Sequence, residues 1–255
     1  MNCPKCNFEQ EDTNTECIKC GIVFAKYSKI QEMRAAEPES ELEAEINTDN
    51  VTVVKEPTAT GFLNYLLYTK PEIAPVYFWG RAIVFLIIFI WGWKFIFTPI
   101  ADKYLLNTFM HMINLPFHET GHIVFKLFGR FMASLGGSLG QILIPLICLF
   151  TLLIKTRDTF GASVTLWWTG QSFIDLAPYI NDARSLIMPL LGGNTGRFSP
   201  YGFHDWEFIL TESGLLQYDH TIARASFTLG SILIILSFIW GGVILYKQYR
   251  NLEKS

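Results

Sequence analysis

The residues best suited to chemistry lie in the stretch LPFHETGHIVF, residues 115–125, where two histidines and a glutamate interrupt an apolar run. When H-E-x-x-H forms a helix, His118 and His122 project from one face and can bind one zinc ion. Glu119 then lies beside the metal-bound water and can act as its general base. Ionisable side chains are costly in an apolar span, so we interpret this motif as a metal site rather than a chance match.

A catalytic zinc ion needs a third protein ligand and an open coordination position. The later segment SFIDLAPYINDARS offers two carboxylates. We expect Asp182 to be the ligand, because Pro178 would bend the helix end and turn this short side chain toward the histidines. Asp175 is an alternative ligand, or else a partner that holds a histidine N–H. The alternative is that Asp182 caps a helix or pairs with Arg184 at the membrane edge.

A second polar cluster, HDW at 204–206, follows a glycine-rich loop. His204 and Asp205 are further candidates to line the mouth of the site, to bind substrate, or to replace Asp182 as the ligand. The competing expectation is that Asp205 caps a short helix that begins there, because aspartate is a favoured N-cap residue.

Two cysteine pairs, CPKC and CIKC, open the chain with the spacing C-x₂-C-x₁₀-C-x₂-C. Four thiolates complete a tetrahedral zinc shell, so we expect a structural zinc ion without catalysis. Gly21, directly after the second pair, helps the backbone turn toward the metal. Two disulfides or free thiols are the alternatives, but a disulfide framework needs an oxidising compartment and no cleavable signal peptide is expected. The expected ligands are Cys3, Cys6, Cys17 and Cys20.

Composition indicates a membrane protein. Half of the 255 residues are hydrophobic and 17% are charged, compared with about 25% charged residues in soluble chains. Apolar runs of bilayer length predict an all-α polytopic membrane domain of about five or six transmembrane helices. The net charge of −3 gives no reason to expect a nucleic-acid partner. The five candidate spans cover 76–98, 105–128, 131–154, a segment from 160 onward, and 225–246.

Three zones are expected along the chain: a zinc ribbon over 1–28, an acidic flexible linker over 29–71, and a helical metalloprotease-like domain over 72–250. The linker composition cannot bury a core. The basic tail KQYRNLEK favours a cytoplasmic C-terminus, and the cysteines favour a cytoplasmic N-terminus. Two cytoplasmic ends require an even number of crossings, so one of the five spans is re-entrant or another lies near 186–216.

The pair HETGH and DLAPYINDAR resembles the site-2 protease family of intramembrane zinc metalloproteases. In that family a glycine-bearing span follows the H-E-x-x-H helix, and SLGGSLGQ is similar to it. An N-x-x-P…D-G pattern comes next: Asp175 stands at the asparagine, Pro178 at the proline, and Asp182 one residue short of the aspartate that binds zinc. Ala183 replaces the family's glycine. The N-terminal segment resembles the short zinc ribbons that begin some bacterial membrane proteins.

This resemblance implies an integral membrane zinc metalloprotease with one catalytic and one structural zinc ion. Its substrate would be a membrane-spanning or membrane-adjacent segment of another protein. The expected location is the bacterial inner membrane, with the zinc ribbon on the cytoplasmic side and the lipid bilayer as the surrounding partner. The alternative is a non-catalytic metal-binding membrane scaffold or regulator. A transporter is a third option, because intramembrane histidine and aspartate residues also relay ions.

Overall fold

The computed structural model of the chain describes residues 1–28, 59–70, 73–191 and 193–252. It divides into two compact units, Met1–Glu56 and Pro57–Ser255. The described residues are mainly helical and form no β-strand beyond isolated bridges, which confirms the all-α expectation. Most of the expected acidic linker, residues 29–58 and 71–72, lies outside the described residues.

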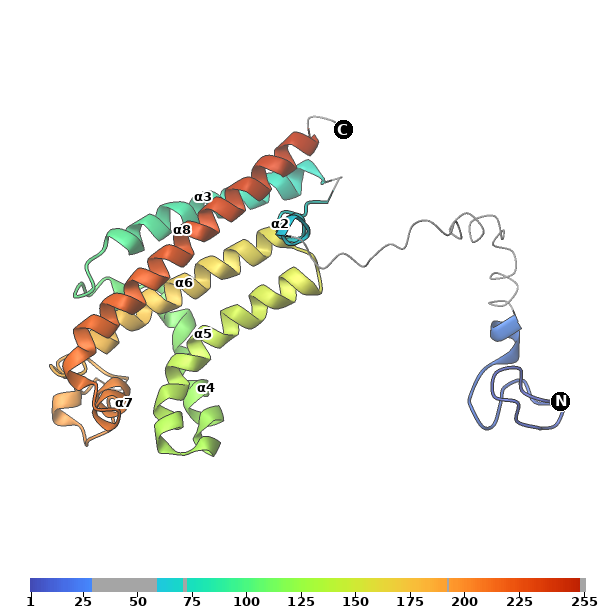
Figure 1. Cartoon of the computed structure of the whole chain (residues 1–255), viewed down its shortest axis with the longest axis horizontal. Helices are drawn as coiled ribbons and strands as arrows, with labels where there is room; N and C mark the ends of the chain where they lie inside the picture. Colours follow the sequence, from blue (N-terminus) through green and yellow to red (C-terminus); the bar gives the residue numbers. More distant parts are fainter. Residues whose placement is uncertain (29–58, 71–72, 192, 253–255) are drawn as a thin grey trace. The chain divides into compact units, whose positions relative to one another are not determined.

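The described residues of the helical unit form seven α-helices. α8 runs beside α6 and α3, and α5 lies on the other side of α6 (Figure 1). All five predicted apolar segments form helices. Their bounds are α2 Ala59–Leu66, α3 Pro75–Phe97, α4 Phe109–Phe125, α5 Arg130–Ile154, α6 Thr159–Asn181, α7 Asp205–Glu212 and α8 Asp219–Leu252.

Three helical segments among the described residues are long and apolar enough to cross a membrane: Pro75–Phe97, Arg130–Ile154 and Leu216–Leu252. They indicate membrane association, but they are fewer than the five or six predicted. Two predicted spans do not meet that standard. α4 has 17 residues, fewer than the roughly 20 that a bilayer core requires. α6 is long enough but carries many polar side chains, which are buried inside the unit.

α6 is the centre of the helical unit. Glycines let α6 and α8 approach closely, because a Cβ at Gly170 would lie 2.7 Å from the Gly230 carbonyl oxygen. Around this contact, aromatic and aliphatic side chains of several helices form a core. Burial of such side chains is the main driving force for this packing. The core consists of Phe95, Leu105, Met110, Trp167, Ile174, Ile234 and Phe238.

α4 packs against the first half of α5, and glycines again determine the distance. A Cβ at Gly121 would collide with the Gly136 carbonyl oxygen. The absence of a side chain at Gly121 therefore permits this close backbone approach. Pro116 lies inside α4 rather than at its start. The H-E-x-x-H segment is therefore held directly against the glycine-rich turns of α5.

The helical unit begins earlier than the predicted boundary at residue 72. α2 lies within the segment expected to be linker, and its Tyr65 hydroxyl donates a hydrogen bond to the Leu153 carbonyl at 3.1 Å. The Thr159 hydroxyl donates to the Tyr68 carbonyl at 2.7 Å. These contacts fix residues 65–68 against the turn between α5 and α6.

Candidate functional site

Two histidines from α4 and one aspartate from α7 form a group that can hold a metal ion. One ligand atom from each of His118, His122 and Asp205 lies within 4.8 Å of the others. The Asp205 Oδ2 atom lies 3.4 Å from the Nε2 atom of each histidine. His118 and Asp205 are buried, whereas His122 is half-buried. The structure thus joins the expected histidine pair to a carboxylate that was only an alternative in the sequence.

Both imidazoles present the same nitrogen to this group. The His118 Nδ1 atom lies 3.2 Å from the Gln141 side-chain oxygen, and the His122 Nδ1 atom lies 2.8 Å from the Ala133 carbonyl oxygen. Because these oxygens accept hydrogen bonds, each Nδ1 carries a proton and each Nε2 keeps a free lone pair in the neutral ring. This is the arrangement that metal-binding histidines require.

Asp175 is not part of the metal-binding group. Its carboxylate contacts the His111 Nδ1 atom at 3.0 Å and accepts hydrogen bonds from the side-chain amides of Asn114 at 3.1 Å and Gln141 at 2.8 Å. Asp175 therefore does partner a histidine, but this is His111, which lies outside the metal-binding group. Asp175 reaches His118 indirectly, by orienting the Gln141 amide whose oxygen faces the His118 ring.

The structure does not bring Asp182 to the histidines, which corrects the expectation that it is the third ligand. Asp182 ends α6, and its carboxylate accepts hydrogen bonds from the Ser185 hydroxyl at 2.6 Å and the Ile187 and Met188 backbone N–H groups at 3.0 and 2.9 Å. Burial raises the pKa of this carboxyl, but contacts with His204, Ser185 and the two amides lower it overall. Both carboxylate oxygens of Asp182 therefore accept hydrogen bonds from the loop after α6.

His204 is also absent from the metal-binding group. It is the N-cap of α7, fully buried, and its Nδ1 atom accepts a hydrogen bond from the Glu207 backbone N–H at 3.2 Å. Its Nε2 atom lies 3.6 Å from the Asp182 carboxylate. The cap was expected at Asp205, one residue later. With His204 as the cap, the Asp205 side chain is available to face α4.

Tyr179 holds Asp205 in place, a role that the sequence did not indicate. The Tyr179 hydroxyl donates to the Asp205 Oδ2 atom at 3.1 Å and accepts from the Asp205 backbone N–H at 3.0 Å. Burial raises the pKa of the Asp205 carboxyl, but the neighbouring imidazoles of His118 and His122 outweigh burial and lower it to about 2. The carboxylate is therefore ionised, as a metal ligand must be.

Gly137 on α5 leaves the space that the two imidazoles occupy. A Cβ at this position would lie 2.6 Å from the Nε2 atoms of both His118 and His122. The sequence signal for this contact was the glycine pair in SLGGSLGQ. The resemblance matched this segment to a glycine-bearing span, but it did not predict that either glycine would contact the histidines. Gly137 thus borders the point where a metal ion would be bound.

A cavity of about 750 Å³ opens beside the metal-binding group. Glu119, half-buried, lines it together with the three candidate ligands and Tyr179. Apolar side chains form much of the remaining wall, among them Leu115, Leu176 and residues 187–191. The cavity therefore combines a polar floor with an apolar wall, as ligand sites commonly do.

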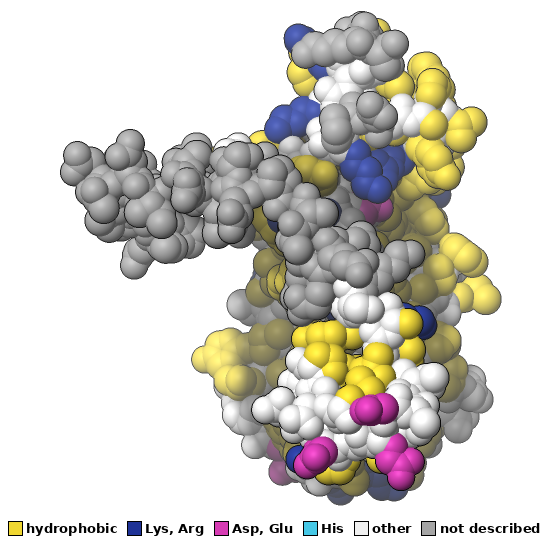
Figure 2. Space-filling view, turned by 90° about the vertical axis from the view of Figure 1, so that its right-hand side faces the viewer, with side chains coloured by type: hydrophobic (Ala, Val, Ile, Leu, Met, Phe, Trp, Pro, Cys, Tyr) yellow, Lys and Arg dark blue, Asp and Glu magenta, His cyan; other side chains and the backbone are white. Residues whose placement is uncertain are grey.

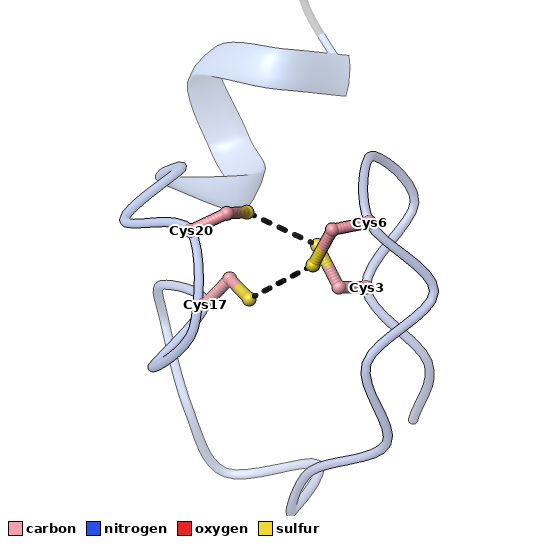
Figure 3. A group of neighbouring side chains, drawn as sticks. All are labelled: Cys3, Cys6, Cys17 and Cys20. Atoms are coloured by element: carbon pink, nitrogen blue, oxygen red, sulfur yellow. Dashed lines mark hydrogen bonds between the residues drawn. The ribbon is translucent and has the colours of Figure 1, made fainter.

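The four N-terminal cysteines form a second candidate metal site, in the Met1–Glu56 unit (Figure 3). Their Sγ atoms lie within 4.8 Å of one another, and all four are free thiols. The Cys3 and Cys20 sulfurs are 3.7 Å apart, as are those of Cys6 and Cys17. The two pairs thus converge from opposite sides, as the spacing predicted.

The two cysteine turns have matching backbones. The residue after each pair adopts a left-handed conformation, with φ of 57° at Asn7 and 69° at Gly21. The Asn7 N–H donates to the Cys3 carbonyl at 2.9 Å, and the Gly21 N–H donates to the Cys17 carbonyl at 2.8 Å. The expected turn at Gly21 is confirmed. Asparagine is one of the few residues that can replace glycine in this conformation.

The thiols of this cluster differ in acidity. Burial raises the pKa of Cys3, but backbone N–H groups of Cys6 and Lys5 lower it to about 6. A backbone N–H of Ile22 lowers the pKa of Cys20, but burial and the three neighbouring thiols raise it to about 12. Crowded thiolates repel one another, so a divalent cation would relieve the repulsion and favour full ionisation.

Comparisons with known proteins add no assignment: no family model, curated protein or solved structure matches this chain.

Proposed function

We propose that this protein is an integral membrane zinc metalloprotease of the site-2 protease-like kind. The observation that carries the proposal is the wall of the 750 Å³ cavity, where His118, His122 and Asp205 can share one ion and Glu119 lies beside them. Three protein ligands leave a fourth position open toward the cavity, as catalytic zinc sites require and structural sites do not.

The donor set fits zinc. Two neutral imidazoles and one ionised carboxylate are a known set of ligands for catalytic zinc. Both Nδ1 atoms have acceptors, so both Nε2 atoms are free to bind. When bound, zinc would supply Lewis-acid polarisation of a carbonyl group and acidify a water molecule. Zinc is likewise the metal we propose for the four cysteines, where a closed thiolate shell gives it a structural role.

The protein residues then have distinct tasks. Glu119 takes a proton from the attacking water and later delivers it to the leaving amine. Gln141 and Ala133 hold the two imidazoles through Nδ1, and Tyr179 holds Asp205. The third ligand comes from α7 rather than from the end of α6, which departs from the family pattern at Asp182.

The proposed substrate is a membrane-spanning or membrane-adjacent segment of another protein. The apolar cavity wall of residues 187–191 and Phe203 suits such a segment. Peptide-bond cleavage also requires room for an unfolded backbone, and the cavity volume allows this. The proposed location is the bacterial inner membrane, with the cysteine site on the cytoplasmic side.

Glu119→Gln tests the proposal. The substitution keeps size and hydrogen bonding but removes the base, so we expect cleavage to fall to background while zinc content stays at the parent value. New protein N-termini would be mapped in membranes that contain the parent or the variant. Glu212→Gln, on the same cavity-bearing unit but outside the site, is the matched control. Identical sets of N-termini for parent and Glu119→Gln would support the non-catalytic scaffold instead.

A further inference from the structure

One end of the helical unit brings together four segments that are far apart in the sequence. The Trp240 indole N–H donates to the Leu66 carbonyl at 2.8 Å, and the Lys247 ammonium donates to the Leu67 carbonyl at 3.0 Å. Arg81 pairs with Asp158 at 3.1 Å. These contacts join the segment after α2, the start of α3, the turn between α5 and α6, and the end of α8.

The described residues of this end, which we call the basic end, carry more basic than acidic side chains. Among the described residues of the helical unit, the carboxylate found there is Asp158, which Arg81 already neutralises in part. In the view of Figure 2, Lys and Arg side chains gather among hydrophobic ones in the upper part of the molecule. The basic end is defined by Lys70, Arg81, Lys155, Arg157, Lys247 and Arg250.

The opposite end carries both signs of charge. Arg184 pairs with Asp219 there, and further acids include Asp102, Glu207 and Glu212. Basic side chains are present at that end too, so the two ends differ in how many carboxylates accompany them among the described residues. An anionic lipid surface attracts such an excess of positive charge.

Aromatic side chains accompany the basic residues. Tyr77, Trp79 and Tyr246 are exposed by 69%, 61% and 61%. Arg157 lies over the Tyr65 ring at 4.3 Å from its centroid. Tyrosine and tryptophan concentrate where hydrocarbon meets headgroups, because one part of the ring is apolar and another is polar. The basic end therefore has both features of a membrane–water interface.

The helices that meet at the basic end determine how often the chain crosses. α3 and α6 begin there, and α5 and α8 end there. α6 runs beside α8 to the opposite end, where the Ser226 hydroxyl donates to the Phe173 carbonyl at 2.7 Å. None of the described α6 residues is exposed. Its polar side chains therefore face protein rather than lipid, and a helix in that position can cross without being apolar.

α4 differs from the other four long helices. It follows the loop after α3 and leads through residues 126–129 into the start of α5. Both of these connections lie at the end opposite the basic end, so α4 enters and leaves from one side. At about 1.5 Å of rise per residue, Asp175 lies about 24 Å along α6 from Thr159. The metal-binding group, joined to Asp175 through Gln141, is therefore near that opposite side.

We propose that the basic end lies in the anionic cytoplasmic leaflet, with four crossings by α3, α5, α6 and α8 and a re-entrant α4. Four crossings place Ala59 and Leu252 on the same side, which satisfies the even count that two cytoplasmic ends require. The chain before Ala59 then starts in a reducing compartment, where thiols stay reduced. This topology is independent of whether the metal site cleaves peptides.

Sealed membrane vesicles test the topology in the full chain. A cleavage site for a sequence-specific protease would be placed after Ser255 in one variant and at Gly214, in the turn after α7, in another. We expect the C-terminal site to be cut in inside-out vesicles and the Gly214 site in right-side-out vesicles. Should the Gly214 variant fail to insert, the same site at the Gly193 turn gives the readout. Cutting of both sites from one face, or the reversed pattern, would overturn the proposal.

Anionic lipid binding tests the surface itself. The thermal unfolding midpoint of the detergent-purified protein would be followed during titration with phosphatidylglycerol or zwitterionic phosphatidylcholine. For the Lys155→Gln/Arg157→Gln variant we expect phosphatidylglycerol to bind more weakly, by about fivefold for each charge removed. The control is Lys126→Gln/Arg224→Gln at the opposite end, which should match the parent. Equal losses in the two variants would show that the basic end has no preference for anionic lipid.

Discussion

The two candidate metal sites of this protein are built in opposite ways. The cysteine site draws its four ligands from residues 3–20, and two matching turns bring them together. The other site joins His118 and His122 on α4 to Asp205 on α7, far along the chain. A local site can form with little surrounding core, whereas the distant one depends on how α4, α5, α6 and α7 pack.

The difference extends to what surrounds the ligands. The four thiols face one another and leave no direction open, which suits a purely structural ion. The histidine–aspartate site borders a 750 Å³ cavity, and each of its ligands is held by a further residue. The comparison teaches that ligand spacing is sufficient to build a closed site, while an open site also needs neighbours that fix each ligand.

The largest expected effect is the loss of one whole metal ion from either site alone. His118→Ala/His122→Ala should reduce zinc content from two ions per chain to one, because a carboxylate alone cannot retain the ion. Cys17→Ser/Cys20→Ser should also leave one ion, at the other site. Elemental analysis of purified protein measures both. Two ions in the histidine variant, or none in either, would contradict the independence of the sites.

The second effect decides between two aspartates. Asp205→Ala should weaken zinc binding at the open site beyond the roughly 10- to 100-fold that follows loss of a residue holding a ligand. Asp182→Ala should change zinc affinity little but lower the unfolding temperature, because each buried backbone N–H left without an acceptor costs about 1–3 kcal/mol. Chelator competition and thermal unfolding separate the two. A larger affinity loss for Asp182→Ala would restore the family pattern.

This pair of aspartates also shows how far sequence reasoning reached. The helix that carries His118 could be predicted, because H-E-x-x-H is a short-range pattern and apolar runs mark helices. The four-cysteine site could also be predicted, because C-x₂-C is a short-range pattern. The third ligand could not, because it depends on where α7 packs. His204 caps α7 and Tyr179 holds the next residue, and neither contact leaves a periodic signal in the sequence.

The number of membrane crossings was also hard to predict from the sequence. Apolar runs predicted five spans, but among the described helices only α3, α5 and α8 are both long and apolar enough to cross. α6 carries many buried polar side chains, and α4 has 17 residues and packs against the glycine turns of α5. Hydropathy measures contact with lipid only when a helix faces lipid. Burial within the unit was therefore the missing information for both helices.

A third effect concerns the space beside the open site. Gly137→Ala should weaken zinc binding markedly, because the added Cβ would lie 2.6 Å from both Nε2 atoms and push the imidazoles apart. Gly80→Ala is the matched control, since Gly80 lies in α3 with no atom within 4 Å of an added Cβ. The cysteine site should keep its ion in both variants. Unchanged zinc affinity in Gly137→Ala would mean that the histidines bind metal from another direction.

The smallest effect sharpens the comparison most, because it tests a hydroxyl group whose two hydrogen bonds both go to the ligand residue Asp205. Tyr179→Phe removes the hydroxyl that contacts both the carboxylate and the backbone N–H of Asp205. Zinc affinity should fall by about tenfold, the lower part of the range for such partners. Tyr201→Phe is the control, because its hydroxyl donates at 2.8 Å to Glu212 on the same α7 helix but does not contact Asp205.

Cobalt substitution separates positioning from general destabilisation in this pair. The visible absorption of cobalt responds to ligand geometry, so the Tyr179→Phe spectrum should differ from the parent, whereas Tyr201→Phe should match it. The cysteine site contributes equally to all three spectra and serves as an internal reference. If both tyrosine variants lost affinity together with unfolding temperature and kept the parent spectrum, Tyr179 would be a packing residue, and Asp205 would be placed by the α7 cap at His204 alone.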